Sequence, residues 1–117
     1  PHRGVYLVAG PAGDEVYAAM RAHPEMVSGE RRDVALLMRG IPGLLAKDGA
    51  EGVDALALPD GRALAIKIAD GGDRARPAEL LAVLRMLGVG VAALVPQLEV
   101  PIMGHGHPVG PVRTAVP

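Results

Sequence analysis

The sequence predicts an α+β fold in which an antiparallel sheet is flanked by helices. Apolar residues recur at helical spacing in two stretches before residue 42 and in one after residue 76, whereas the segment between them alternates apolar and polar residues as strands do. A Pro-Asp-Gly-Arg turn at residues 59–62 divides that segment, so its two halves can pair as a hairpin. This order of elements is typical of an antiparallel sheet covered by helices on one side.

The composition predicts a single domain, or a piece of one, over residues 1–117. The apolar fraction is 50%, but the chain has no Phe, no Trp and only two Tyr, so its core must consist of Leu, Val, Ala, Ile and Met. Such a core buries less area per residue than an aromatic one, and we expect the fold to depend more on a partner or on missing sequence. The start at Pro1 rather than at Met indicates processing, cloning or truncation.

The N-terminal third is predicted to be helical over residues 13–41. Before it, Gly and Pro punctuate the sequence and predict irregular backbone or an edge strand around residues 5–9. Asp14 is a candidate N-cap of a first helix, which Pro24 ends. After a turn at "PEMVSGE", a second helix is expected from Arg31, with apolar residues on one face and arginines outside.

The remaining elements are a strand region, a helix and a tail. Residues 44–69 are predicted to form a short strand followed by the hairpin. Residues 76–88 are predicted to be a helix, because Pro77 suits its first turn and Gly88 suits its C-terminal cap. Recurrent prolines predict an extended tail over residues 96–117.

Charge and cysteine content exclude several classes of protein. The formal net charge is −1 and basic residues are spread among acidic ones, which argues against a nucleic-acid partner. The absence of cysteine excludes disulfides, thiolate catalysis and cysteine metal sites. Charged residues, Gly and Pro interrupt the most apolar window, residues 80–103, so no membrane span is predicted. We expect a cytoplasmic protein.

No cofactor or metal site is predicted. The glycine-containing loops lack the spacing of dinucleotide-binding and phosphate-binding motifs. His105 and His107 lie close enough in sequence to share an ion, but zinc needs three or four ligands. We therefore rank metal binding by these two histidines below every other functional hypothesis for the chain.

Acyl-transfer chemistry needs a Ser, Thr or Cys nucleophile beside a base, and the chain offers few candidates. Ser28 is its single serine and Thr114 its single threonine. Ser28 is most simply a cap or turn residue. No Ser-x-x-Lys pair occurs in the sequence, so these residues alone do not contain a complete hydrolase site.

Two lysines in the predicted strands remain as candidates. Lys67 alternates with isoleucines, which a position on the solvent face of the sheet explains. Lys47, in "LLAKDGAEGV", follows an apolar run and precedes glycines that let a ligand approach the backbone closely. Its ammonium can hold a substrate carboxylate, or feed a proton relay if burial lowers its pKa. On residue chemistry alone, a solvated lysine at a strand end remains the simpler explanation.

The sequence resembles a known family over most of its length. The stretches "AAMRAHPEMVSGERRDVALLMRGIPGLLAKDGAEGV" and "ALPDGRALAIKIADGGDRARPAELLAVLRMLGV" are similar to the C-terminal part of the bacterial L-asparaginase II family. This is the thermolabile type related to serine β-lactamases and glutaminases. The similarity runs from about Asp14 to Val89, and the tail "PIMGHGHPVGPVR" resembles the family's ending.

The resemblance implies a fold and a reaction. It implies part of a serine β-lactamase-like fold, and hydrolysis of L-asparagine to L-aspartate and ammonia. The family's nucleophile lies in an N-terminal Ser-x-x-Lys motif, which this chain lacks. We therefore interpret the chain as a C-terminal segment of an L-asparaginase that is inactive by itself.

The resemblance also implies site residues. Lys47 matches the family's second active-site lysine and is predicted to be catalytic, across from a serine outside this chain. Asp48, Gly49, Ala50 and Gly52 are predicted to line the substrate site. Asp48 departs from the hydroxyl residue of the related Lys-Thr/Ser-Gly motif of β-lactamases, so a hydroxyl contact is not expected. Some relatives have a cysteine where this chain has residues 33–35, and its role does not transfer.

The expected partners follow from this interpretation. They are L-asparagine as a small-molecule substrate, and the missing N-terminal part of the same protein or a partner chain that supplies it. No nucleic acid or membrane is expected to bind. The alternative is a catalytically inactive structural fragment, in which an exposed apolar sheet face drives association into a homo-oligomer.

Overall fold

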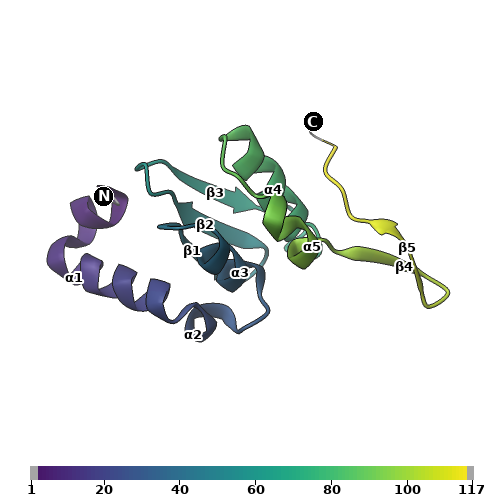
Figure 1. Ribbon diagram of the computed structural model, residues 1–117, viewed down its shortest axis with the longest axis horizontal. Helices are drawn as coiled ribbons and strands as arrows, with labels where there is room; N and C mark the ends of the chain where they lie inside the picture. Colours follow the sequence, from purple (N-terminus) through teal and green to yellow (C-terminus); the bar gives the residue numbers. More distant parts are fainter. Residues whose placement is uncertain (1–2, 116–117) are drawn as a thin grey trace.

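The computed structural model describes residues 3–115, and their side chains from residue 10 onward. In chain order its elements are α1 (Arg3–Ala22), α2 (Pro24–Ser28), α3 (Asp33–Gly40), β1 (Leu45–Gly49), β2 (Val53–Ala57), β3 (Ala63–Lys67), α4 (Arg76–Met86), the 3₁₀ helix η1 (Ala92–Leu94), α5 (Val95–Leu98), β4 (Pro101–Gly104) and β5 (His107–Pro111). Figure 1 shows their arrangement. The described part of the chain is therefore α+β, with antiparallel sheets and helices.

The central sheet is a meander in which β2 pairs with both β1 and β3, each time antiparallel. The tight turn predicted at residues 59–62 is present, and the Leu58 amide donates to the Arg62 carbonyl at 2.8 Å. Because successive strand residues point to opposite faces, the register places Asp48 and Asp54 together on one face of the sheet. Lys47 lies on the opposite face.

The hydrophobic core lies between one face of this sheet and the helices α3 and α4, which precede and follow it in the chain, respectively. The predicted apolar faces of both helices are confirmed, because Val34, Leu37 and Leu84 have no exposed surface. The buried cluster comprises Val34, Leu37, Met38, Ile41, Leu44, Ala46, Leu56, Leu58, Leu80, Leu81, Leu84, Val91, Leu94 and Leu98. None of these side chains is aromatic, as the composition required.

Helix α1 differs from the sequence-based expectation. The edge strand predicted around residues 5–9 is wrong, because these residues are helical. The helix is broken by non-helical angles at Gly10 (φ 53°, ψ −140°), and Pro11 follows directly. Proline suits the first turn of a helix, so the second half of α1 begins there and Asp14 lies inside it rather than at its N-cap.

Side chains from α1 attach this helix to the segment between α3 and β1. The Arg21 guanidinium donates to the carbonyls of Met38 and Leu44, the latter at 2.7 Å. The Tyr17 hydroxyl donates to the Gly43 carbonyl at 2.9 Å. These bonds satisfy carbonyls that the end of α3 and the following turn leave without helical partners.

Short helices and a second hairpin replace segments expected to be irregular. The sequence "PEMVSGE", predicted as a turn, contains α2. The tail predicted to be extended over residues 96–117 begins with α5 and continues as the hairpin β4–β5. The hairpin turns at His105 (φ 48°) and Gly106 (φ 82°), both in the left-handed region. Proline content predicted extended backbone but not the pairing of two short strands.

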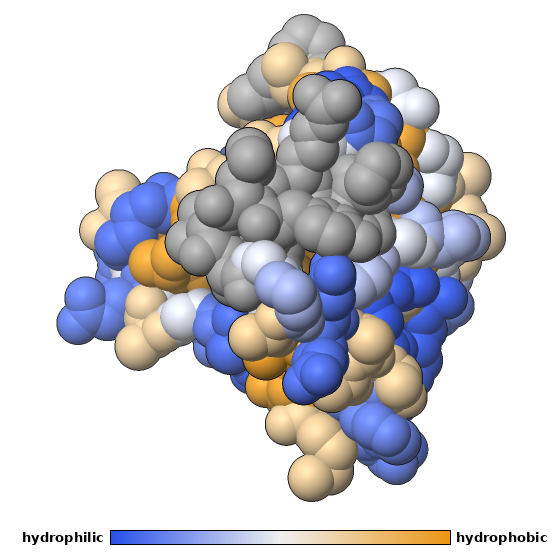
Figure 2. Space-filling model, turned by 90° about the vertical axis from the view of Figure 1, so that its left-hand side faces the viewer, coloured by the Kyte–Doolittle hydropathy of each residue, from blue (hydrophilic) through white to orange (hydrophobic). Residues whose placement is uncertain are grey.

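The hairpin β4–β5 projects from the rest of the molecule (Figure 1). The whole molecule, including the hairpin, measures 52 × 29 × 28 Å along its principal axes. The hairpin side chains Ile102, Met103 and Val109 are exposed by 48%, 55% and 68%. At the opposite end of the molecule, Figure 2 shows hydrophobic residues in small groups separated by hydrophilic ones. Within residues 3–115, the helices are too short or too polar to cross a bilayer.

Candidate functional site

Lys47 occupies the middle of β1, not its end. Its Cα pairs with that of Ala55 on β2, and the strand continues through Asp48 and Gly49. Its side chain is 55% exposed, while its neighbour Ala46 is fully buried in the core. The alternation of the strand therefore points Lys47 away from the core and Asp48 toward the helices.

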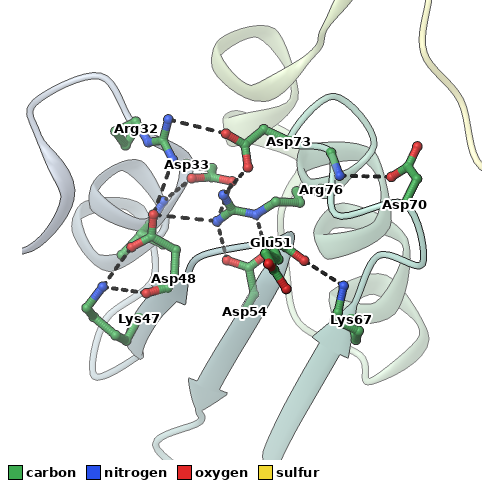
Figure 3. A network of polar contacts seen from close by, with 12 residues as sticks. Arg32, Asp33, Lys47, Asp48, Glu51, Asp54, Lys67, Asp70, Asp73 and Arg76 are labelled. Atoms are coloured by element: carbon green, nitrogen blue, oxygen red, sulfur yellow. Dashed lines mark hydrogen bonds and ion pairs between the residues drawn. The ribbon is translucent and has the colours of Figure 1, made fainter.

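Asp48 contacts three cationic side chains (Figure 3). Its Oδ1 accepts from the Lys47 ammonium at 3.0 Å. Its Oδ2 lies 3.2 Å from Nη2 of Arg32, just before α3, and 3.8 Å from Nη2 of Arg76 in α4. The Asp48 side chain is 15% exposed, so these contacts take the place of much of its hydration.

Arg76 is the buried centre of this network. Its side chain is 1% exposed, and its Nε donates to Asp54 Oδ2 at 2.7 Å while its Nη2 donates to Asp54 Oδ1. The same guanidinium donates to Asp73 at 3.0 Å and lies 3.4 Å from Asp33. This two-bonded arginine–carboxylate geometry is the strong form of a charge-assisted hydrogen bond.

The register explains why a buried cation is needed. Asp48 and Asp54 are directly opposite each other on β1 and β2, and both point toward the helices. Like charges in such a cross-strand pair repel each other. Arg76 contacts both carboxylates from above the sheet, and therefore converts a repulsive pair into an attractive cluster.

The pKa shifts reflect this arrangement. Burial acts to raise the pKa of Asp48, but hydrogen bonds from Lys47 and Arg32 outweigh it and hold that pKa below its ordinary value of 3.8. Burial raises the pKa of Asp33, an effect that the charge of Arg76 only partly offsets. The hydrogen bond to Asp54 raises the pKa of Arg76 further above that of an ordinary guanidinium, which is already charged at neutral pH.

An open, polar cavity of about 550 Å³ lies beside the network. It is lined by Arg32, Lys47, Asp48, Gly49, Ala50, Glu51, Gly71 and Asp73. The cavity thus brings together both signs of charge and the backbone of the turn between β1 and β2. Such a surface is chemically suited to a small zwitterion that carries a carboxylate and an ammonium group.

Four of the five predicted site residues, numbers 47–50, line this cavity. Gly52 belongs to the same turn but does not line the cavity, and its carbonyl accepts from the Ile68 amide at 2.8 Å. Its φ is 69°, and a Cβ there would approach Ile68 Cβ to 2.9 Å and the Gly71 backbone to 3.1 Å. Gly52 therefore has a structural reason to be glycine, since it shapes the turn that carries residues 49–51.

The sequence analysis missed the network behind Lys47. Arg76 was expected only as the first residue of a helix, and Asp54 only as part of a strand. A signal was present, because Asp54 falls on the same face as Leu56 and Leu58. A carboxylate on an apolar strand face requires a buried cationic partner.

The other candidates have simpler roles. Lys67 donates to the carbonyls of Glu51 and Ile68, each at 2.6 Å, so it holds the turn after β1. Ser28 is the last residue of α2, and its Oγ is buried with no hydrogen-bond partner among the described residues. His105 and His107 are both exposed at the tip of the hairpin. Across residues 3–115, no three or more acidic or histidine side chains group as metal ligands.

The fold and site define an α+β chain with a lysine-bearing polar cavity on an antiparallel sheet. Comparison with family models identifies it further, because the model of L-asparaginase II matches residues 7–114. The chain therefore belongs to the L-asparaginase II family. No curated protein matches the chain.

Replacing Arg76 by methionine tests its role at the centre of the network. R76M leaves Asp54 buried and unpaired, so we expect the free energy of unfolding to fall by about 3–5 kcal/mol. R85M is the matched control, because Arg85 is an exposed arginine on the same helix, and a change within about 0.5 kcal/mol is expected. Urea denaturation measures both. An R76M variant as stable as R85M would refute the central role of Arg76.

Acid titration should separate the two shifted carboxyls by sign. The stability that Asp48 contributes is present above its ordinary pKa of 3.8 and is lost as the pH falls through the lower folded-state value. Asp33 behaves oppositely, because its raised pKa makes the folded chain take up a proton first. As the pH falls, D48N should therefore gain stability relative to wild type, and D33N should lose it. Denaturation curves of wild type, D48N and D33N from pH 7 to pH 3 measure this. The prediction is contradicted if the stability differences of the two variants from wild type change in the same direction as the pH falls.

Proposed function

We propose that the chain forms the C-terminal part of an L-asparaginase active site and takes part in the hydrolysis of L-asparagine to L-aspartate and ammonia. Membership of the L-asparaginase II family supports the reaction. The observation that carries the proposal for the site is the polar cavity on β1, which Lys47 enters with Asp48, Gly49 and Ala50. Its lining is compatible with an amino acid substrate.

Within this proposal, the nucleophilic serine comes from a Ser-x-x-Lys motif outside these 117 residues. Ser28 does not fit that role, because the residue three places further on is Arg31 and its Oγ is buried. The 117-residue chain is then inactive by itself. It acts together with the N-terminal part of the same protein or with a partner chain that supplies the motif.

The proposed role of Lys47 is electrostatic or proton-transferring at the reacting centre. Lys47 lines the cavity, where its Nζ can bind the substrate carboxylate or exchange a proton with the nucleophilic serine supplied from outside this chain. Asp48 departs from the hydroxyl residue of the related β-lactamase motif and offers a carboxylate in its place. Gly49 and Ala50 present a backbone that a small substrate can approach.

The finer family features belong to the same proposal. They are a serine β-lactamase-like fold completed by the N-terminal part, the thermolabile type of asparaginase, and a cytoplasmic location. The antiparallel sheet covered by α3 and α4 is compatible with such a fold. No cofactor is part of the proposed reaction, since the chemistry needs only a nucleophile, a base and charge stabilisation.

A second candidate function is a structural or oligomerising module without activity. The exposed apolar side chains of the hairpin, Ile102, Met103 and Val109, favour it. The outward face of the sheet also carries small apolar residues such as Ala55 and Ala65, both exposed. Either surface is able to bury apolar area against a second copy.

Reconstitution of ammonia release tests the catalytic assignment. The chain is expressed alone and together with a Ser-x-x-Lys-bearing N-terminal part of an L-asparaginase II protein, and ammonia from L-asparagine is measured. We expect activity only in the combination, and a loss of at least about 100-fold in kcat/KM for K47A. R85A is the control, because Arg85 is an exposed cation on α4 that is not among the residues lining the cavity. Full activity of K47A would disprove the assignment.

Light scattering tests the second function. An oligomerising module gives a mass of at least twice 12.0 kDa, and replacing both Ile102 and Val109 by asparagine lowers it toward that of the monomer. A strictly monomeric wild-type chain at high concentration is the result that would exclude this alternative.

A further inference from the structure

We propose that Asp48 is a positioning residue that holds the Lys47 ammonium in the cavity, and that Arg76 in turn fixes Asp48 from the core. This inference rests on the proposed role of Lys47 in the asparaginase site. It assigns a role to the one site residue that departs from the related hydroxyl-containing motif.

The contacts of Asp48 are divided between its two oxygens. Oδ1 faces outward and accepts from Lys47 Nζ at 3.0 Å. Oδ2 faces the helices and contacts Nη2 of Arg32 at 3.2 Å and Nη2 of Arg76 at 3.8 Å. The carboxylate therefore bridges a cation at the cavity surface to two cations that other elements hold in place (Figure 3).

The inner end of this bridge is rigid. Arg76 has 1% of its side chain exposed and is bonded through Nε and Nη2 to Asp54, which is fully buried. Because two of its nitrogens are bonded to a buried carboxylate, the Arg76 guanidinium does not move with the exposed side chains of the cavity. Asp33 and Asp73 contact the guanidinium of Arg76 as well. The cation that faces Asp48 Oδ2 is therefore held by residues from α3, α4 and β2 and from the loop before α4.

The outer end needs such a support. The Lys47 side chain is long, flexible and 55% exposed, and an unpaired lysine at this exposure samples many rotamers. The bond to Asp48, together with one to the Asp48 carbonyl, selects conformations in which Nζ lies over the turn that lines the cavity. Preorganisation of this kind raises the rate by keeping the reacting group in place.

A purely structural role for Asp48 makes a different prediction. In that case the carboxylate only joins β1 to Arg32 and Arg76, and the state of Lys47 is independent of it. The two roles therefore differ in whether the Lys47 ammonium responds to the charge of Asp48.

NMR of the 117-residue chain measures this response without any enzymatic assay. With ¹⁵N-labelled lysine side chains, we expect the Lys47 Nζ signal to shift with the same midpoint as the Asp48 carboxyl carbon, below pH 3.8. Lys67, which bonds to backbone carbonyls, is the internal control and should not follow that titration. At pH 6, where no acid unfolding intervenes, D48N should lower the order parameter of the Lys47 ammonium and leave that of Lys67 unchanged. A Lys47 signal indifferent to both changes would overturn the proposal.

Kinetics of the reconstituted enzyme form the second arm. D48N is expected to lower kcat by about 10- to 100-fold with KM changed less than about threefold, and D48E to recover part of the loss. D60N is the control, because Asp60 is an exposed aspartate that pairs with Arg62 in the β2–β3 turn. If K47A is inactive while D48N keeps full kcat, positioning by Asp48 is wrong. If K47A itself is active, the proposed function fails, whatever the NMR coupling shows.

Discussion

The buried ion pair between Arg76 and Asp54 is the interaction on which the relation between helices and sheet depends. Burying either charge without the other would cost far more than a single apolar contact returns, so the two must meet wherever the fold places them. Asp54 lies on the middle strand and Arg76 in the first turn of α4. Their pairing therefore fixes how α4 lies over the sheet, which a core of interchangeable leucines specifies less sharply.

The same pair links the core to the candidate site. Asp48 is the cross-strand neighbour of Asp54, and its charge is tolerated at that position because Arg76 and Arg32 face it. The polar cavity is consequently not a separate surface feature. It is the outer edge of a charge cluster whose centre lies in the core, and membership of the L-asparaginase II family gives that cluster a chemical context.

Local patterns predicted the elements that depend on neighbouring residues. The hairpin at residues 53–69 and the apolar faces of α3 and α4 follow from periodicity and turn chemistry, and the structure contains them. Lys47 stood out by its place before a glycine-rich turn, but its catalytic role was predicted only from the family resemblance, and that role stays a prediction. The contacts of Asp48 were invisible in the sequence, because Arg32 and Arg76 are 16 and 28 positions away and meet it only after folding. The start of α1 was misjudged for another reason, since a glycine and a proline can interrupt a helix without ending it.

The hairpin β4–β5 has a consequence for the cooperativity of the molecule. A two-stranded ribbon with its hydrophobic side chains in water is only marginally stable by itself. Its opening exposes little new apolar surface, so its free energy of opening is well below that of global unfolding. We therefore expect a core that unfolds as a whole and a ribbon that opens locally while the lysine-bearing cavity stays intact.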